Sequence, residues 1–200
     1  MNVDRPKESR LNSRSALLII DVQNDFLPGG RLPVPSGDTI IPKLNACIER
    51  FRAQNLPVFA TRDWHPPNHG SFREQGGPWP PHCIAGTPGA DFAATLALPA
   101  ETHIISKGTR PEDSGYSGFS DTDLAVRLRG LGATTLYVGG LATDYCVLNT
   151  VLDARKLGFT TYLLSDAVRA VEVQPGDGER ALREMRRQGA RFLTSERIAA

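Results

Sequence analysis

The chain alternates between short apolar runs and longer segments in which apolar residues recur about once per helical turn. A short, continuous apolar run bounded by polar or turn-forming residues is typical of a strand that is covered on both faces. Such runs predict six strands, over Ser15–Asp21, Pro57–Arg62, Thr102–Ser106, Thr135–Gly139, Thr160–Ser165 and Arg191–Thr194. The segments between them predict helices over Asp38–Gln54, Asp121–Leu131, Thr143–Leu157 and Asp177–Gln188.

This order of elements predicts an α/β fold. Because a strand, a helix and a further strand close into a parallel unit, we expect a three-layer α/β/α sandwich with a mostly parallel six-stranded sheet. No linker or internal repeat divides the chain, so residues 15–200 are predicted to form a single domain. Residues 1–14 are polar and charged, and they are predicted to form a flexible N-terminal arm.

The stretch between Asp63 and Glu101 interrupts this alternation. It holds seven of the fifteen prolines and has no long element, although Asp91–Leu96 is expected to form a short helix. Trp64 and Trp79 lie within it, and disordered segments are poor in large aromatic residues. An ordered loop of this length inside a compact domain is usually a lid or a binding loop.

Composition and charge exclude several classes of partner. A net charge of +1 provides no electrostatic basis for binding nucleic acid or an anionic membrane surface. No apolar run approaches the roughly 20 residues of a membrane-spanning helix, and no secretory signal is visible at the start of the chain. Three cysteines, an odd number without the spacing of a disulfide framework, are expected to be free thiols. The sequence therefore predicts a cytoplasmic protein.

Chemically reactive residues follow four of the predicted strands. Asp21 ends the first strand, and Asp63 and His65 follow the second. Lys107 follows the third strand, and Cys146 lies just past the fourth. Ligands of open parallel sheets bind at the carboxyl ends of the strands. Each of these residues alone has an ordinary structural explanation, but their convergence on one edge of the sheet predicts an active site.

Cys146 is the candidate nucleophile. It lies in the first turn of a predicted helix with Thr143 as the expected N-cap, and the positive end of the helix dipole favours a thiolate there. Asp21 is the candidate proton acceptor and donor, and Lys107 is the cation that keeps this carboxylate oriented. The backbone N–H groups of Ala142 and Cys146 are candidates for an oxyanion hole. The alternative interpretation of Cys146 is a small buried apolar residue, as most free cysteines are.

A second constellation has the composition of a metal site. Asp63 and His65 stand two residues apart, so they point to the same side of an extended chain. His82 lies in a proline-rich part of the same long loop. Two histidines and one carboxylate suit zinc, iron or manganese, with open positions left for other ligands. Two further residues of this loop, His69 and Ser71, are expected to be a surface histidine and a turn serine.

Longer motifs of the chain resemble a known family of hydrolases. The similarity covers Ala16 to Phe192 and is carried by LLIIDVQNDFLPGG, TRDWHPPNHGSF, WPPHCIAGTPGADF, KG at 107–108, GYSGF and GGLATDYCV. WPPHC followed by GTPGA is specific to nicotinamidases, whereas DVQNDF and ATDYCV are shared more widely. The chain therefore resembles the nicotinamidases, or pyrazinamidases, of the isochorismatase-like cysteine hydrolase superfamily.

This resemblance implies an activity. Family members hydrolyse nicotinamide to nicotinate and ammonia through a cysteine thioester, as part of NAD salvage, and pyrazinamide is a close analogue that we expect to be accepted. The implied catalytic triad is Asp21, Lys107 and Cys146, in agreement with the positions of these residues at the strand ends. The expected partner is thus a small-molecule amide. Because the family includes monomers and larger homo-oligomers, the resemblance is compatible with a homo-oligomer and does not determine the oligomeric state.

The resemblance also implies how the substrate is held. One divalent metal ion, zinc or iron ahead of manganese, binds the pyridine nitrogen from the site with two histidines and one aspartate. An aromatic pocket corresponds to Phe26, Trp79 and Tyr116, and a cis peptide bond precedes Ala142. Some relatives place a further histidine ligand where this chain has Ser71, so a fourth protein ligand is not implied here.

Three alternatives remain beside this prediction. The first is a related cysteine amidohydrolase that acts on another small amide or on a carbamoyl compound. The second is an enzyme in which the metal activates a water molecule and Cys146 takes no part in the reaction. The third is a protein that has kept the fold as a binding module without catalysis.

Overall fold

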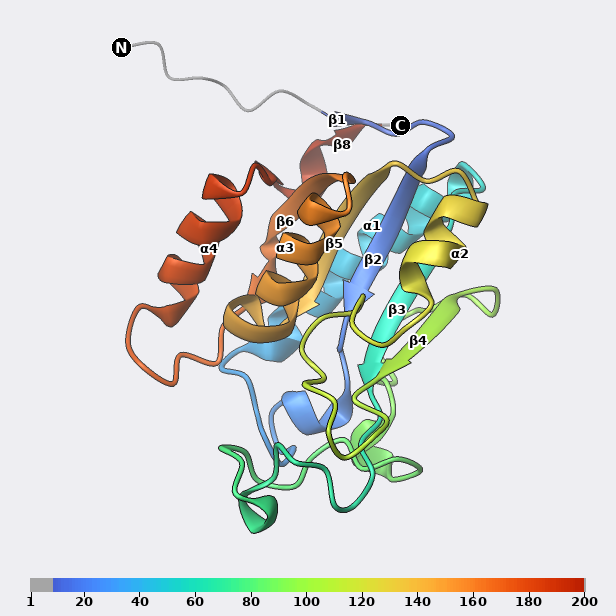
Figure 1. The fold of residues 1–200 in the computed structure, drawn as a ribbon. Helices are drawn as coiled ribbons and strands as arrows, with labels where there is room; N and C mark the ends of the chain where they lie inside the picture. Colours follow the sequence, from blue (N-terminus) through green and yellow to red (C-terminus); the bar gives the residue numbers. More distant parts are fainter. Residues whose placement is uncertain (1–8, 200) are drawn as a thin grey trace.

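The computed structural model describes residues 9–199, and its centre is a six-stranded sheet, most of which can be followed in Figure 1. The strands are β2 (Ser15–Ile20), β3 (Val58–Asp63), β4 (His103–Lys107), β5 (Thr135–Leu141), β6 (Thr160–Arg169) and β7 (Arg191–Leu193). They lie in the order β4-β3-β2-β5-β6-β7, and every neighbouring pair is parallel. The predicted parallel sheet is thus confirmed.

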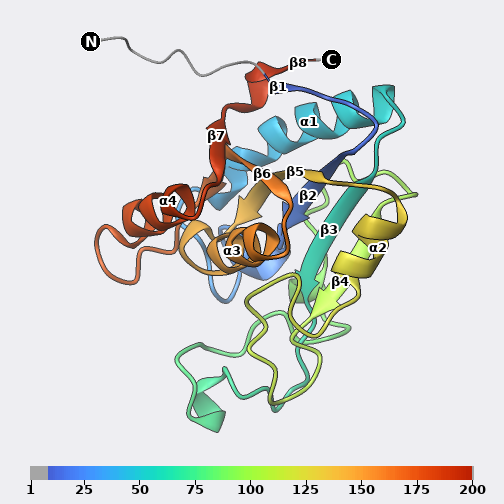
Figure 2. The ribbon, with the colours of Figure 1, turned by 45° about the horizontal axis from the view of Figure 1, so that its top comes forward.

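Helices cover both faces of this sheet. Helix α1 (Ile41–Ala53) lies on one face, and α2 (Leu124–Gly130), α3 (Leu148–Lys156) and α4 (Asp177–Arg187) lie on the other (Figures 1 and 2). Successive residues of β2 alternate between two apolar clusters. Leu17 packs on the side of α1, and Leu18 packs on the side of the other helices. Burial on both faces explains why the strand is continuously apolar. No helix within residues 9–199 is long and apolar enough to cross a lipid bilayer.

The short helix predicted at Asp91–Leu96 is wrong. A 3₁₀ turn lies just before it, at Pro88–Ala90. The following residues run beside the chain that leaves β2, where Ala93 donates its N–H to the Val22 carbonyl and Asn24 donates to the Asp91 carbonyl. Because these backbone groups pair with another segment, they are not available for a helical turn.

The N-terminal segment is packed from residue 9 onward. Strand β1 (Ser9–Arg10) pairs in parallel with β8 (Ile198–Ala199), and the Ser9 hydroxyl lies 2.6 Å from the hydroxyl of Tyr137. The folded part of the chain therefore begins before residue 15. Residues 1–8, which belong to the predicted N-terminal arm, lie outside the described residues.

The close approach of β2 and β5 requires glycine at position 140. Gly140 has a φ of +129°, and a Cβ there would overlap the backbone of Ile20. We expect Gly140→Ala to lower the free energy of unfolding by about 3 kcal/mol, because both the backbone conformation and the strand spacing would be strained. Urea denaturation would measure this change. Gly130→Ala is the matched control, since a Cβ at Gly130 meets nothing within 4 Å. Equal stability of the two variants would contradict the requirement for glycine at position 140.

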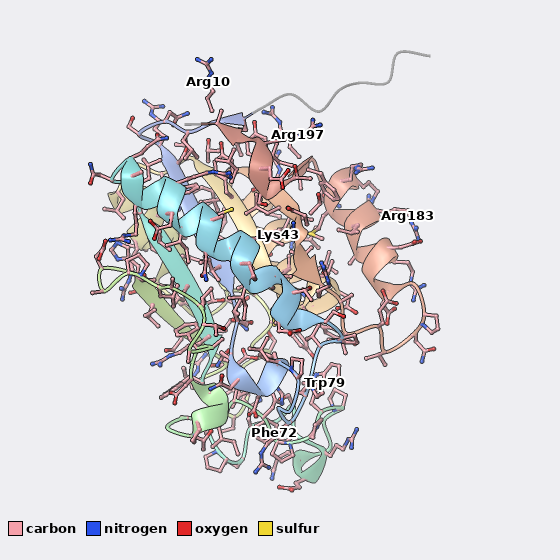
Figure 3. The ribbon with its side chains drawn as sticks, turned by 180° about the vertical axis from the view of Figure 1, so that it is seen from behind. Arg10, Lys43, Phe72, Trp79, Arg183 and Arg197 are labelled. Atoms are coloured by element: carbon pink, nitrogen blue, oxygen red, sulfur yellow. The ribbon has the colours of Figure 1, made fainter. Side chains whose placement is uncertain are left out.

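The strand order also determines where a ligand can bind. From β2 the chain moves outward through β3 to β4, and then returns to place β5 on the other side of β2. A crevice opens at such a reversal, beyond the carboxyl ends of the two strands. The long loop covers this edge, and its Phe72 and Trp79 lie at the opposite end of the molecule from Arg10 and Arg197 (Figure 3).

Candidate active site

Lys107 is the centre of the site, and its side chain is buried. The register of β3 and β4 pairs Asp63 with Lys107, so both side chains leave the sheet at the same level. The ammonium donates to Asp63 Oδ1 at 2.5 Å, to the Gly115 carbonyl at 2.5 Å and to Cys146 Sγ at 3.4 Å. It also forms an ion pair with Asp21 Oδ2 at 2.7 Å. One lysine thus joins two carboxylates and the thiol.

Asp21 keeps one carboxylate oxygen available beside that thiol. Its backbone has a φ of +47°, a conformation that is uncommon outside glycine. Thr61 fixes the residue by donating its hydroxyl to Asp21 Oδ1 at 2.6 Å. Oδ2 faces Lys107 and accepts no aligned hydrogen bond from the described residues. Ligand atoms of Asp21, Asp63 and Cys146 lie within 4.8 Å of one another, so the thiol proton has a carboxylate acceptor nearby.

Burial and neighbouring charges shift the pKa values of this cluster. Burial raises the pKa of the Cys146 thiol well above its usual value, and Lys107 only partly opposes that shift. Burial also raises the pKa of Asp21, against the opposing effect of Lys107. For Lys107 itself, burial lowers the pKa, but Asp21 and Asp63 together raise it well above normal. Burial therefore opposes the thiolate that the helix start was expected to favour, whereas the Lys107 ammonium favours it, and Asp21 is needed as the acceptor of the thiol proton.

The turn that carries Cys146 differs from the predicted helix start. A cis peptide bond joins Leu141 to Ala142, as the family resemblance implied. Residues Thr143–Val147 then form a π-helical turn in which Val147 donates its N–H to the Ala142 carbonyl. Ala142 is the N-cap, so the prediction of Thr143 is wrong, and no side chain caps the turn. The carboxylate of Asp144 accepts hydrogen bonds from the N–H groups of residues 171 and 172, which lie beyond the end of β6.

Asp63, His65 and His82 are brought together as the composition of the loop suggested. Their ligand atoms lie within 4.8 Å of one another, and Asp63 Oδ2 is 3.4 Å from His65 Nε2 and 3.9 Å from His82 Nε2. Metal–ligand bonds of about 2.0–2.2 Å place neighbouring ligands roughly 3–3.5 Å apart, so one divalent ion fits between these atoms. Burial would raise the pKa of Asp63, but Lys107 and His65 lower it, which keeps the carboxylate ionised.

The second nitrogen of each histidine is fixed by a backbone carbonyl. Nδ1 of His65 lies 2.8 Å from the Gly108 oxygen, and Nδ1 of His82 lies 2.8 Å from the Pro80 oxygen. A carbonyl can only accept, so Nδ1 carries the proton in both rings. This leaves the Nε2 lone pairs directed at the metal position, as in many metal sites of known structure.

Two residues that the sequence analysis did not single out hold this loop in place. The side-chain amide of Gln23 donates to the Asp63 and Ala90 carbonyls and accepts the Asp63 N–H, at 2.8–2.9 Å. Asp25 accepts the Cys83 N–H at 2.7 Å, next to His82. Alternate residues of the segment that follows β2 thus connect it to both ends of the metal loop. Only the unusual density of polar residues directly after a buried strand could have indicated these contacts.

His69 is not the surface residue that was expected. It is fully buried, and its ring stacks on His65 with centroids 3.9 Å apart. Its Nδ1 lies 2.7 Å from Ser71 Oγ. Phe72 contacts the rings of His65, His69 and His82 from one side. The loop curls back on itself, and this packing of aromatic rings could not be read from residue spacing.

A cavity joins the two clusters. The aromatic residues suggested by the family resemblance, Phe26, Trp79 and Tyr116, all line it, and Trp79 donates its indole N–H to the Tyr116 hydroxyl at 3.0 Å. Tyr145, which lies in the π-helical turn, completes this wall by packing edge-on against Trp79. The remaining lining residues are Leu32, Asp63, His65, Ser71, His82, Ser114, Gly115, Ala142, Cys146 and Val171.

Comparison with known proteins gives a consistent picture. The Isochorismatase domain model matches residues 15–197. A nicotinamidase of Escherichia coli is 39% identical over 200 residues, which cover 90% of this chain and 94% of that protein. The crystal structure of a pyrazinamidase of Pyrococcus horikoshii in complex with zinc superposes with a TM-score of 0.87 and 53% identity, covering 90% of this chain and 99% of the other. PnC1 from L. infantum in complex with nicotinate gives 0.89 and 37%, covering 96% and 98%. The chain therefore belongs to the isochorismatase family.

Proposed function

We propose that this protein hydrolyses nicotinamide to nicotinate and ammonia through a thioester on Cys146. One observation carries the proposal: the Asp21–Lys107–Cys146 cluster and the Asp63–His65–His82 ligand set line or adjoin one cavity with aromatic walls. The names of the relatives, nicotinamidase and pyrazinamidase, support this choice of substrate.

The acylation step uses Asp21 Oδ2, the carboxylate oxygen that faces Lys107. As Sγ of Cys146 attacks the amide carbon, Asp21 Oδ2 takes the thiol proton, a C–S bond forms and the carbonyl becomes an oxyanion. The backbone N–H groups of Ala142 and Cys146 stabilise that oxyanion. Asp21 then returns the proton to the amide nitrogen, the C–N bond breaks and ammonia leaves. Lys107 stays protonated and stabilises the negative charge as it moves between carboxylate and sulfur.

The deacylation step reverses these roles. Asp21 takes a proton from a water molecule, whose oxygen attacks the thioester carbon. The C–S bond breaks, the sulfur recovers the proton from Asp21, and nicotinic acid leaves and loses its carboxyl proton to water as nicotinate. Orientation of the ring by Phe26, Trp79 and Tyr116 contributes because it holds the amide carbon near Sγ.

A divalent ion held by the two histidines and Asp63 would supply a Lewis-acidic position for the pyridine nitrogen. Zinc and iron suit this ligand set best, and manganese is a third candidate. The P. horikoshii structure, whose bound metal is zinc, supports zinc in particular.

The Gln23 clamp is expected to matter for metal binding. Gln23→Ala removes the hydrogen bonds to both backbone groups of Asp63, so we expect metal affinity to fall by about 10- to 100-fold. Competition with a chromogenic chelator would measure this. Asn24→Ala is the matched control, because the side-chain amide of the exposed Asn24 donates to the Pro88 carbonyl and to no group of Asp63 among residues 9–199. If both variants bind metal with equal affinity, Gln23 does not position Asp63 as a metal ligand.

The wider setting follows from this activity. Nicotinate production fits NAD salvage, and pyrazinamide differs from nicotinamide by a single ring nitrogen, so it should also be a substrate. The three cysteines are all free thiols, which is consistent with a reducing cytoplasm.

Ammonia release by the purified, metal-loaded protein tests the proposal. Nicotinamide and pyrazinamide should give the highest kcat/KM in a panel that also contains benzamide, N-carbamoylsarcosine and ureidoacrylate. Benzamide lacks the ring nitrogen and should be poor. Faster turnover of a carbamoyl compound would identify a related amidohydrolase instead. Release of ammonia from none of the compounds would favour a binding module without catalysis.

A further inference from the structure

We propose that His69 is a positioning residue, which fixes the hydroxyl of Ser71 so that the serine oxygen faces the metal-binding cavity as a hydrogen-bond acceptor. The inference rests on the proposed function, because it assumes that a divalent ion occupies the site of Asp63, His65 and His82. It assigns a role to a residue whose type and position in the chain suggested only a surface histidine.

The backbone determines which nitrogen of His69 carries the proton. Ser71 donates its backbone N–H to His69 Nδ1 at 3.3 Å, and a backbone N–H cannot accept. Nδ1 is therefore the unprotonated nitrogen. The Ser71 hydroxyl, 2.7 Å from the same atom, must also donate to it. With its only proton committed to His69, Ser71 Oγ can act only as an acceptor toward its other neighbours.

Packing alone does not explain a histidine at position 69. The side chain is fully buried, and its Nε2 has no hydrogen-bond partner among the described residues. A buried polar atom without a partner reduces stability by about 1–3 kcal/mol, so an apolar ring would pack here at lower cost. What histidine adds over such a ring is the acceptor at Nδ1, which holds Ser71.

The position of the pair relates it to the metal site. The ring of His69 stacks on His65, at an interplanar angle of 28°, while its own nitrogens lie outside the ligand cluster. Ser71 lines the cavity together with Asp63, His65 and His82. An acceptor in this place suits a strong donor, and water bound to a divalent ion is a much stronger donor than bulk water. The geometry therefore points to Ser71 Oγ as the acceptor for a water ligand of the ion.

Zinc affinity measured on the apoprotein tests this role without turnover. His69→Phe keeps a ring to stack on His65 but removes the acceptor, and Ser71→Ala removes the hydroxyl. Each should weaken zinc binding by about tenfold or more in competition with a chromogenic chelator. The double variant should bind zinc no more weakly than Ser71→Ala alone, because both changes break the same interaction. His69→Asn, whose side-chain oxygen can occupy the position of Nδ1, should retain most of the affinity.

Specific results would overturn the inference. Additive losses in the double variant would mean that His69 acts without Ser71. Equal losses in His69→Asn and His69→Phe, with unchanged thermal melting of both, would mean that the acceptor is irrelevant. Wild-type protein that binds no zinc would overturn the inference directly. If the variants behave as expected but the zinc-loaded wild type releases no ammonia from nicotinamide, the proposed function fails and the role of His69 stands.

Discussion

Replacing Cys146 with alanine should lower kcat for nicotinamide by about 10⁴-fold or more, because the acceptor of the acyl group is then absent. The sulfur is buried 3.4 Å from Lys107 Nζ, and it shares a 4.8 Å cluster with Asp21. Removing it leaves the carboxylate and the ammonium with nothing to activate. Ammonia release under saturating nicotinamide, with metal content checked in parallel, measures the effect.

A second thiol provides the control. Cys47 is also fully buried, but it lies on α1, and burial raises its pKa to about 12. Cys47→Ala should leave kcat unchanged even if stability falls slightly. Substantial activity in Cys146→Ala that disappears on chelation would instead support a metal-activated water with an inert cysteine.

Replacing Lys107 with methionine should lower both activity and stability. Methionine keeps much of the length of the side chain, but it leaves the buried Asp21 carboxylate without its cation and removes one cation from the buried Asp63 carboxylate. Removing one partner of a buried ion pair typically costs about 3–5 kcal/mol, which corresponds to a fall in Tm of about 6–20 °C for a chain of this size. Activity should fall nearly as far as in Cys146→Ala, because the members of such a unit act together.

The pH dependence of stability distinguishes loss of the Lys107 charge from loss of its packing as the cause of the lower stability. Loss of the ammonium raises the pKa of the folded-state carboxyls above their unfolded values, so the destabilisation should grow as pH rises from about 5 to about 8. Adding Asp21→Asn to Lys107→Met removes one of the two charges and should recover part of the stability but none of the activity. Urea denaturation of the three proteins would measure this. A deficit that is independent of pH and of Asp21→Asn would indicate lost packing.

Much of the fold follows from local sequence patterns. Strands such as β2 are continuously apolar because both sheet faces are covered, as the two clusters on either side of β2 demonstrate. A parallel sheet in turn brings strand ends together, so the residues that end or follow β2, β3, β4 and β5 could be placed at one edge from their order alone. The proximity of Asp21, Asp63, Lys107 and Cys146 could be predicted in this way.

The remaining features depend on contacts between distant segments. The raised pKa of the Cys146 thiol results from burial, which the position of a residue at a helix start does not reveal. The clamp of Gln23 on Asp63 joins residues 40 positions apart in the chain. His69 is buried because the long loop folds back onto His65, and no periodic pattern describes such a loop.

Acyl transfer to hydroxylamine tests most directly whether Cys146 carries the acyl group. If a thioester forms, the nitrogen of hydroxylamine competes with water for the acyl carbon, the C–S bond breaks and nicotinohydroxamate is released. We expect wild-type protein to convert nicotinamide into ammonia plus a mixture of nicotinate and nicotinohydroxamate, whose hydroxamate share rises with hydroxylamine concentration, and Cys146→Ala to form neither product above background. Nicotinate as the sole product at every hydroxylamine concentration, with ammonia release undiminished, would contradict a covalent intermediate on Cys146.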